Sequence, residues 1–127
     1  MTKLRELYKC DICGNVTEIV NEGAPALVCC NQPMMKLEAK SEDQGQEKHV
    51  PVIKDTECCI IVDVGEVSHP MEEKHYIKFI EVLTKNSVLR CELSPGEAPS
   101  AKFCIDKSEV IEVREYCTIH GLWKKLS

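Results

Sequence analysis

The hydrophobic pattern of the chain changes near residue 50. Beyond it, apolar residues gather in runs of strand length, at 50–53, 58–64, 76–83, 88–93, 102–105 and 110–116. Several runs alternate with polar residues at a period of two, which is typical of half-buried strands. Turn residues separate the runs, and no long helical period competes with them. The pattern predicts an antiparallel β-sandwich of about 80 residues.

The first 37 residues contain only short apolar stretches between turns. A segment of this length cannot bury enough apolar surface to fold alone. We therefore expect a covalent or metal staple within it. The residues that follow it are almost wholly polar and indicate a linker. The predicted fold class is all-β, with a small domain at 1–37, a linker at 38–47 and a β-sandwich at 48–127.

Composition and charge narrow the possible functions. The 127 residues carry a net charge of −5 and a pI near 5.4, without a basic stripe, which argues against nucleic-acid binding. No apolar run has the length needed to span a bilayer, and the charged N-terminus lacks the apolar segment of a signal peptide. We therefore expect a cytoplasmic protein with neither a membrane nor a nucleic-acid partner.

Nine cysteines in a cytosolic chain are better explained as metal ligands than as disulfides. Cys10 and Cys13, followed by Gly14, form a knuckle in which two thiolates on a tight turn can face one ion. Cys29 and Cys30 follow at a distance that allows a strand–turn–strand return. Together they predict a tetrahedral four-thiolate site for zinc or a single iron. The spacing alone leaves the metal open, and a structural zinc staple or a disulfide between Cys29 and Cys30 remains an alternative.

A second candidate set contains every histidine of the chain. Cys117 and His120 form a mixed knuckle that Gly121 closes, and His49, His69 and His75 lie in distinctive local settings. Taken singly, each histidine is more typical of a surface or core position than of a ligand. The joint pattern, in which no histidine is left over, favours a metal site.

Four cysteines fall outside both sets: Cys58, Cys59, Cys91 and Cys104. They lie within predicted strands and lack partners at knuckle spacing, so we interpret them as small buried hydrophobic residues.

Five segments of the chain resemble those of the desulfoferrodoxin family, the two-iron superoxide reductases. In order along the sequence they are residues 8–15, 29–32, 47–52, 69–77 and 115–123. The resemblance implies a desulforedoxin-like N-terminal domain with an FeS4 centre and an immunoglobulin-like sandwich with a catalytic iron.

The resemblance also implies the roles of particular residues. Cys10, Cys13, Cys29 and Cys30 would hold the first iron. The second iron would be square-pyramidal, with four equatorial imidazoles and one axial thiolate, from His49, His69, His75, His120 and Cys117. Glu47 would occupy the remaining position in the ferric resting state, and Lys48 would lie beside it as a catalytic residue.

The implied reaction is the one-electron reduction of superoxide to hydrogen peroxide, without dioxygen production. Ferrous iron with one thiolate and four neutral imidazoles carries a local charge of about +1, which attracts a small anion to an acidic protein. The implied partners are a rubredoxin-like electron donor and a second copy of the chain in a homodimer. A pure electron carrier and a zinc-stapled binding module remain as alternatives.

Overall fold

The computed structural model describes residues 1–42, 49–65 and 69–127. Glu47 and Lys48 therefore lie outside the described residues. The chain divides into two compact units, Met1–Glu38 and Ala39–Ser127. Within the described ranges, no helix is long and apolar enough to cross a membrane.

The first unit consists of very short strands. They are β1 (Leu7–Lys9), β2 (Val16–Glu18), β3 (Val28–Cys29), β4 (Gln32–Pro33) and β5 (Met35–Lys36). Strands β2, β1 and β5 form one antiparallel sheet, and β3 pairs with β4. Few side chains are buried here, among them Leu7, Cys10 and Ile19. So small an apolar interior agrees with the expectation that a staple holds this unit together.

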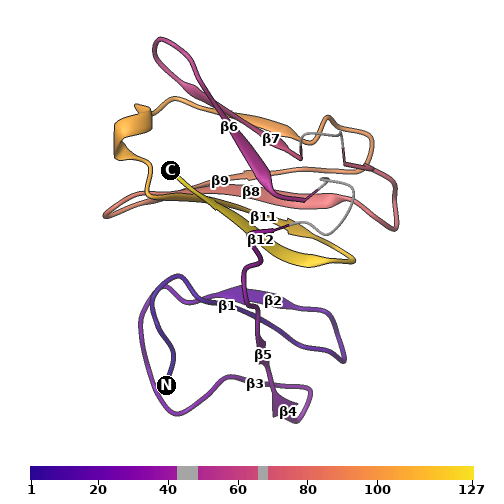
Figure 1. Ribbon diagram of the computed structural model, residues 1–127. Coiled ribbons are helices and arrows are strands. Elements are labelled where there is room, and N and C mark those ends of the chain that lie inside the picture. The colour runs from indigo at the N-terminus through magenta and orange to yellow at the C-terminus, as the bar shows by residue number, and fades with distance from the viewer. Residues whose placement is uncertain (43–48, 66–68) are drawn as a thin grey trace. The chain divides into compact units, whose positions relative to one another are not determined.

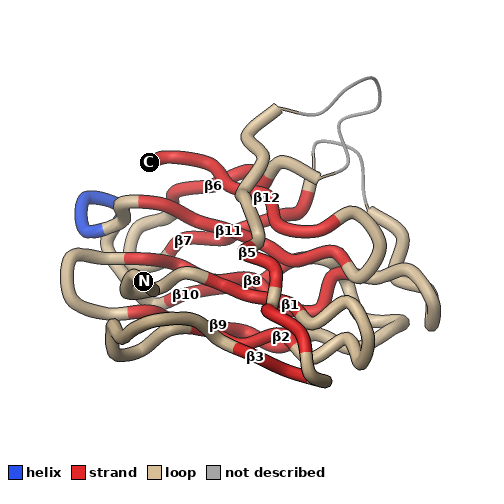
Figure 2. The backbone as a smooth tube through the Cα atoms, turned by 90° about the horizontal axis from the view of Figure 1, so that it is seen from below, coloured by secondary structure: helices blue, strands red, loops and turns tan. Residues whose placement is uncertain are grey.

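The second unit is an antiparallel β-sandwich (Figures 1 and 2). One sheet has the order β10-β7-β6 and the other β12-β11-β8-β9. Their elements are β6 (Pro51–Asp55), β7 (Ile60–Val64), β8 (Ile77–Leu83), β9 (Val88–Glu92), β10 (Ser100–Phe103), the 3-10 helix η1 (Lys107–Glu109), β11 (Glu112–Cys117) and β12 (Gly121–Leu126). The inward side chains of both sheets form the core, including Ile60, Val62, Val64, Ile77, Ile80, Val82, Phe103 and Val113. The predicted all-β fold class is confirmed.

The structure contains several elements and one contact that the sequence did not predict. Sequence periodicity did not predict β4, β5, β12 or the helix η1, because each is short or carries polar residues on its exposed side. In the segment predicted as a linker, Lys40 forms a parallel bridge with Trp123 of β12. Its backbone N–H donates to the Leu122 carbonyl at 3.0 Å. The third residue of the predicted linker is thus held against the sandwich.

The sequence pattern predicts that the leftover cysteines are buried hydrophobic residues within strands. The burial is wrong for Cys58 and Cys104, and the placement within strands is wrong for Cys58, Cys59 and Cys104. Cys58 and Cys104 are exposed, whereas Cys59 is buried and Cys91 is half-buried. Strand β7 begins after Cys59, and β10 ends before Cys104. The apolar runs continued past the strand ends, so periodicity placed these residues inside the strands.

An ion cluster around the buried carboxylate of Glu81 crosses the larger sheet. The Glu81 carboxylate accepts from Arg90 at 2.9 Å and from Arg114 at 2.6 Å. Strand register places both arginines directly opposite Glu81, on β9 and β11. Because each charge has a partner, the polar side of β8 can be buried without leaving an isolated charge.

Candidate metal centres

Four thiols gather in the first unit. The sulfurs of Cys10, Cys13, Cys29 and Cys30 all lie within 4.8 Å of one another. The Cys13 and Cys29 sulfurs are 3.5 Å apart, and those of Cys29 and Cys30 are 4.0 Å apart. Cys10 is buried and Cys13 and Cys30 are exposed, so the cluster lies at the surface of the unit.

Backbone turns bring these sulfurs together. In the first turn the Gly14 N–H donates to the Cys10 carbonyl at 2.9 Å, and Gly14 has a φ of 83°, which suits glycine. In the second turn the positive φ values belong to Cys30 (53°) and Asn31 (60°). A left-handed conformation at Cys30 allows two adjacent side chains to face one point, a geometry that an extended strand would forbid.

The thiols differ in acidity because they share one small volume. The Cys13 backbone N–H donates to the Cys10 sulfur and lowers the pKa of Cys10 to about 7. The neighbouring sulfurs, that of Cys13 first, raise the pKa of Cys30 to about 12. Four thiolates this close repel one another, so a cation at their centre is needed to deprotonate all four. Their number and geometry suit a closed tetrahedral site.

The second cluster lies at one end of the sandwich, because strand register places five donors there. His75 lies two residues before β8, Cys117 ends β11, and His120 directly precedes β12. Strand β11 pairs antiparallel with both β8 and β12, so the three donors meet at the same end of their sheet.

The opposing sheet supplies the other two donors. His49 lies two residues before β6, whose Pro51 pairs with Val64 at the end of β7. His69 lies shortly after that end. All five donor atoms lie within 4.8 Å of one another.

The four imidazoles form a closed ring. His49 contacts His69, His69 contacts His75, His75 contacts His120, and His120 contacts His49. Ring centroids are 4.7 to 5.0 Å apart, and neighbouring planes meet at 66° to 83°. The Cys117 sulfur lies 3.4 Å from His69 Nε2 and 3.8 Å from His120 Nδ1. The arrangement is four nitrogens around a centre with one sulfur.

The protonation of this ring suits metal coordination. Burial lowers the pKa of His69 to about 4, so its imidazole is neutral at neutral pH. Its Nδ1 lies 2.7 Å from the Pro70 carbonyl, which can only accept, so Nδ1 carries the proton and the Nε2 lone pair faces Cys117. His75 Nε2 is buried and lacks a hydrogen-bond partner in the described part of the chain. A buried polar atom left without a partner is costly unless a cation or another polar group satisfies it.

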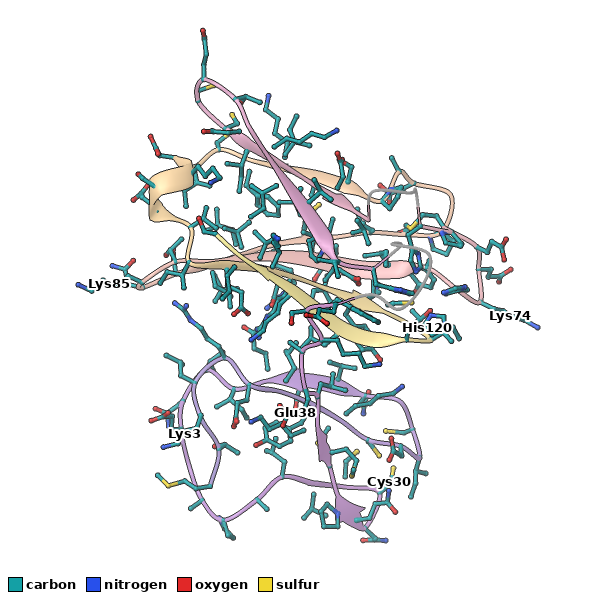
Figure 3. All side chains as sticks on the ribbon, in the orientation of Figure 1. Lys3, Cys30, Glu38, Lys74, Lys85 and His120 are labelled. Carbon is teal, nitrogen blue, oxygen red and sulfur yellow. The ribbon has the colours of Figure 1, made fainter. Side chains whose placement is uncertain are left out.

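The sulfur is at the buried side of the cluster and a histidine is at its exposed side. Cys117 has no exposed surface, whereas His120 is exposed and is labelled at the edge of the sandwich in Figure 3. Burial raises the pKa of Cys117, and the His120 backbone N–H, 3.4 Å from the sulfur, opposes that shift. Gly121, with a φ of 85°, completes this knuckle as Gly14 completes the first.

Two residues that sequence reasoning did not assign support the histidine ring. Trp123 stacks on His49 with centroids 4.6 Å apart and planes 15° apart, and its Nε1 donates to the His120 carbonyl at 3.2 Å. The Lys40 ammonium lies over the Trp123 ring, with Nζ 5.0 Å from the ring centroid, and donates to the His120 carbonyl at 3.4 Å. Trp123 is the sole tryptophan of the chain and lies in the segment 115–123 that resembles the family, whereas nothing in the sequence pattern marked Lys40.

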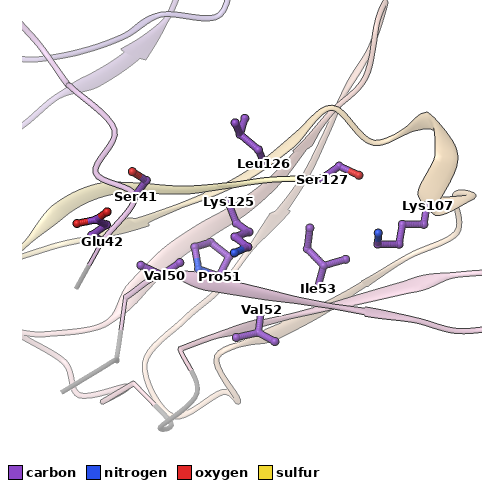
Figure 4. Close-up of a pocket in the computed structure, with 10 residues that line it drawn as sticks. All are labelled: Ser41, Glu42, Val50, Pro51, Val52, Ile53, Lys107, Lys125, Leu126 and Ser127. Atoms are coloured by element: carbon purple, nitrogen blue, oxygen red, sulfur yellow. The ribbon is translucent and has the colours of Figure 1, made fainter. Parts of the chain in front are cut away.

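A separate concavity of about 610 Å³ lies along β6 and the end of β12 (Figure 4). It is lined by Ser41, Glu42, Val50, Pro51, Val52, Ile53, Lys107, Lys125, Leu126 and Ser127. Its lining includes none of the cysteine and histidine side chains of the two clusters.

Comparison with known sequences identifies the family. The desulfoferrodoxin family profile matches residues 41–126, and the profile of the desulfoferrodoxin N-terminal domain matches residues 2–37. The chain belongs to the desulfoferrodoxin family. The resemblance drawn from the five motifs is thereby confirmed.

Similar proteins cover nearly the whole chain. A desulfoferrodoxin homolog from Methanothermobacter thermautotrophicus is 50% identical over 97% of this chain and 99% of its own length. A desulfoferrodoxin from Syntrophotalea carbinolica is 49% identical over 97% of each chain. The crystal structure of the superoxide reductase from Treponema pallidum superposes with a TM-score of 0.78 at 26% identity, covering 94% of this chain and 96% of that one.

Both clusters fit the two iron ions of this family, one in a four-cysteine site and one in a site of four histidines and one cysteine. Four thiolates suit a closed iron site. The second set offers the neutral imidazole of His69, the buried sulfur of Cys117 and the unsatisfied Nε2 of His75, each of which a bound cation would give a partner.

We predict that Cys13→Ser removes the N-terminal metal and loosens only the first unit. The purified variant should hold about one iron per chain, because the remaining three thiolates cannot complete a tetrahedron. Limited proteolysis should then cut within residues 1–38 at least about tenfold faster. Cys91→Ser, a half-buried cysteine of β9, is the matched control and should keep both irons. An unchanged proteolysis rate would show that the first unit is stable without its metal.

We predict that Trp123→Leu weakens metal retention at the second cluster alone. Loss of the stacking on His49 and of the bond to the His120 carbonyl should lower metal affinity by about 10- to 100-fold. Iron content after dialysis against a chelator measures the effect, and the four-cysteine site serves as an internal reference. Trp123→Phe keeps a ring beside His49 but lacks Nε1, so it should fall between. Equal retention in all three proteins would mean that Trp123 has no role in holding the site.

Proposed function

We propose that this chain is a superoxide reductase that converts superoxide, one electron and two protons into hydrogen peroxide without forming dioxygen. The observation that carries the proposal is the closed ring of four imidazoles with the Cys117 sulfur on its buried side and an exposed side at His120. Membership of the desulfoferrodoxin family and the likeness to a solved superoxide reductase support it.

In this proposal the five donors have distinct tasks. His49, His69, His75 and His120 hold the metal as neutral ligands, and Cys117 supplies the negatively charged ligand. When bound, the iron supplies the electron that reduces superoxide and regains it from an external one-electron donor. The Pro70 carbonyl keeps the proton of His69 on Nδ1, and Trp123 keeps the His49 ring in place. The exposed side is where a small anion can approach.

The four-cysteine site has a supporting role in this proposal. Four thiolates around one ion leave no position for a substrate, so this site can staple the first unit and at most pass electrons. We propose a rubredoxin-like protein as the donor, and a cytoplasmic homodimer as the working form.

Glu47 and Lys48 complete the proposed chemistry, although both lie outside the described residues. They immediately precede His49 in the sequence. The Lys48 ammonium attracts the superoxide anion and delivers a proton through water. The Glu47 carboxylate competes with the neutral product for the open side of the site and so promotes its release.

The direct test mixes the reduced two-iron protein with superoxide and measures both possible products. We expect about one peroxide per superoxide consumed, with the iron oxidised in step and no dioxygen released. His75→Ala should abolish the reaction while leaving the spectrum of the four-cysteine site intact. Dioxygen and peroxide in equal amounts would indicate dismutation and overturn the proposal. Irons that superoxide leaves reduced would indicate an electron carrier that does not act on superoxide.

Lys48→Ala should slow the bimolecular reaction with superoxide by about tenfold and reduce its dependence on ionic strength, because a positive charge near the entrance is lost. Stopped-flow measurement at several salt concentrations gives both quantities. Lys85→Ala is the charge-matched control, since Lys85 lies at the other end of the sandwich from His120 (Figure 3). If the two variants react equally fast, Lys48 has no steering role.

A further inference from the structure

Three thiols that belong to neither metal cluster meet beside the β6–β7 hairpin. The Cys59 sulfur lies 3.4 Å from that of Cys58 and 3.5 Å from that of Cys104. Cys58 and Cys59 lie in the turn between β6 and β7, and Cys104 directly follows β10. At about 3.3 Å per residue, the run from His49 to Asp55 along β6 places this hairpin roughly 20 Å from the histidine ring. The thiols therefore form a separate site.

Strand register favours a bond between Cys59 and Cys104. Strands β7 and β10 are antiparallel, and Ile60 lies opposite Phe103. One further step of the same register places Cys59 opposite Cys104. Opposed residues of an antiparallel pair have Cα atoms about 4.5 to 5.5 Å apart, within the range that a disulfide requires.

The alternative bond, between Cys58 and Cys59, is less favourable. A disulfide between neighbours closes a small ring that contains their own peptide bond, and the planarity of that bond resists closure. The cross-strand pair meets no such resistance, because 45 residues separate its two cysteines in sequence.

The sulfurs of Cys104 and Cys59 also differ in exposure, as is required when a peroxide oxidises one of them first. Cys104 is exposed, so a small oxidant can reach it, whereas Cys59 is 4% exposed. The neighbouring thiols, Cys58 first and then Cys104, raise the pKa of Cys59 to about 11, and burial adds to this rise. Cys59 therefore stays protonated at neutral pH, and the first oxidation falls on an exposed sulfur.

We propose that Cys104 and Cys59 are a peroxide-oxidised dithiol that forms a cross-strand disulfide. The Cys104 thiolate attacks hydrogen peroxide, the O–O bond breaks, and a sulfenic acid and hydroxide result. The Cys59 thiol then displaces the sulfenic oxygen, so that the S–S bond forms and water leaves. In sum, two thiols lose two electrons and two protons, and one peroxide becomes two waters. The source of the peroxide rests on the proposed function, whereas the pair itself does not.

The test exposes the reduced two-iron protein to a few equivalents of added hydrogen peroxide without air, then blocks free thiols by alkylation. We expect a mass loss of about 2 Da per chain before alkylation and two fewer alkylated cysteines. Trypsin should then release a crosslinked pair of peptides, 55–74 with 103–107, that dithiothreitol separates. Because both Cys58 and Cys59 lie in the first peptide, the variants assign the bond.

Three matched variants decide the assignment. Cys104→Ser should lose the crosslink completely, whereas Cys58→Ser and Cys91→Ser should form it at a rate within about twofold of the parent protein. Iron content and visible spectra report whether each variant is folded. The crosslink in the parent protein remains informative if Cys104→Ser does not fold.

Several outcomes would overturn the proposal. They are a crosslink that survives Cys104→Ser, oxidation only to sulfinic or sulfonic acids, and thiols that do not react. A third, thiol-bound metal ion in the purified protein that blocks alkylation until it is chelated would also overturn it.

Because the peroxide is added, this test does not depend on the proposed reductase activity. If the crosslink forms with added peroxide, but the reaction of the protein with superoxide releases dioxygen and peroxide in equal amounts, the dithiol stands and the proposed reductase activity is wrong.

Discussion

The pairing of β11 with β8 on one side and β12 on the other is the interaction on which the second metal centre depends. This ladder places the end of β11 beside the starts of β8 and β12, and so gathers Cys117, His75 and His120 at one point. A register shift between Tyr116 and Cys117 accompanies the end of the ladder, where Cys117 lies opposite Ile77. A slip of one residue would turn Cys117 away from the interior and separate the donors.

The packing of the two sheets adds what one ladder cannot supply. His49 and His69 come from the β6–β7 side, and they meet the other three donors only because the apolar interior holds the two sheets face to face. Packing thus concentrates donors whose own mutual interaction is unfavourable. Burial favours a neutral His69, His75 Nε2 is left unsatisfied, and the Cys117 thiol resists ionisation without a cation. The rigid sandwich offsets these costs, and a bound metal relieves them.

Both units must hold several metal-ligand side chains close together, and they do so with different donor atoms. In the first unit, four thiols at the surface need a cation before all can ionise, and a tetrahedron of thiolates then closes the site. In the second unit, four imidazoles form the ring and leave the His120 side accessible. A third gathering, of Cys58, Cys59 and Cys104, has neither geometry. Its opposed pair is suited to bond formation between sulfurs, which distinguishes a redox pair from a metal site.

The sequence by itself determined the all-β class, the two cysteine knuckles with their glycines, and the family, because these depend on local spacing and periodicity. It also identified all four histidines as candidate metal ligands, since the joint pattern included every histidine of the chain. Only the tertiary structure decided that the imidazoles form a closed ring and that Trp123 and Lys40 support it, because these contacts join residues up to 80 positions apart. Likewise, local sequence spacing could not predict that Cys59 lies beside Cys104. Strand register, set by the hydrophobic core of the whole sandwich, brought them together.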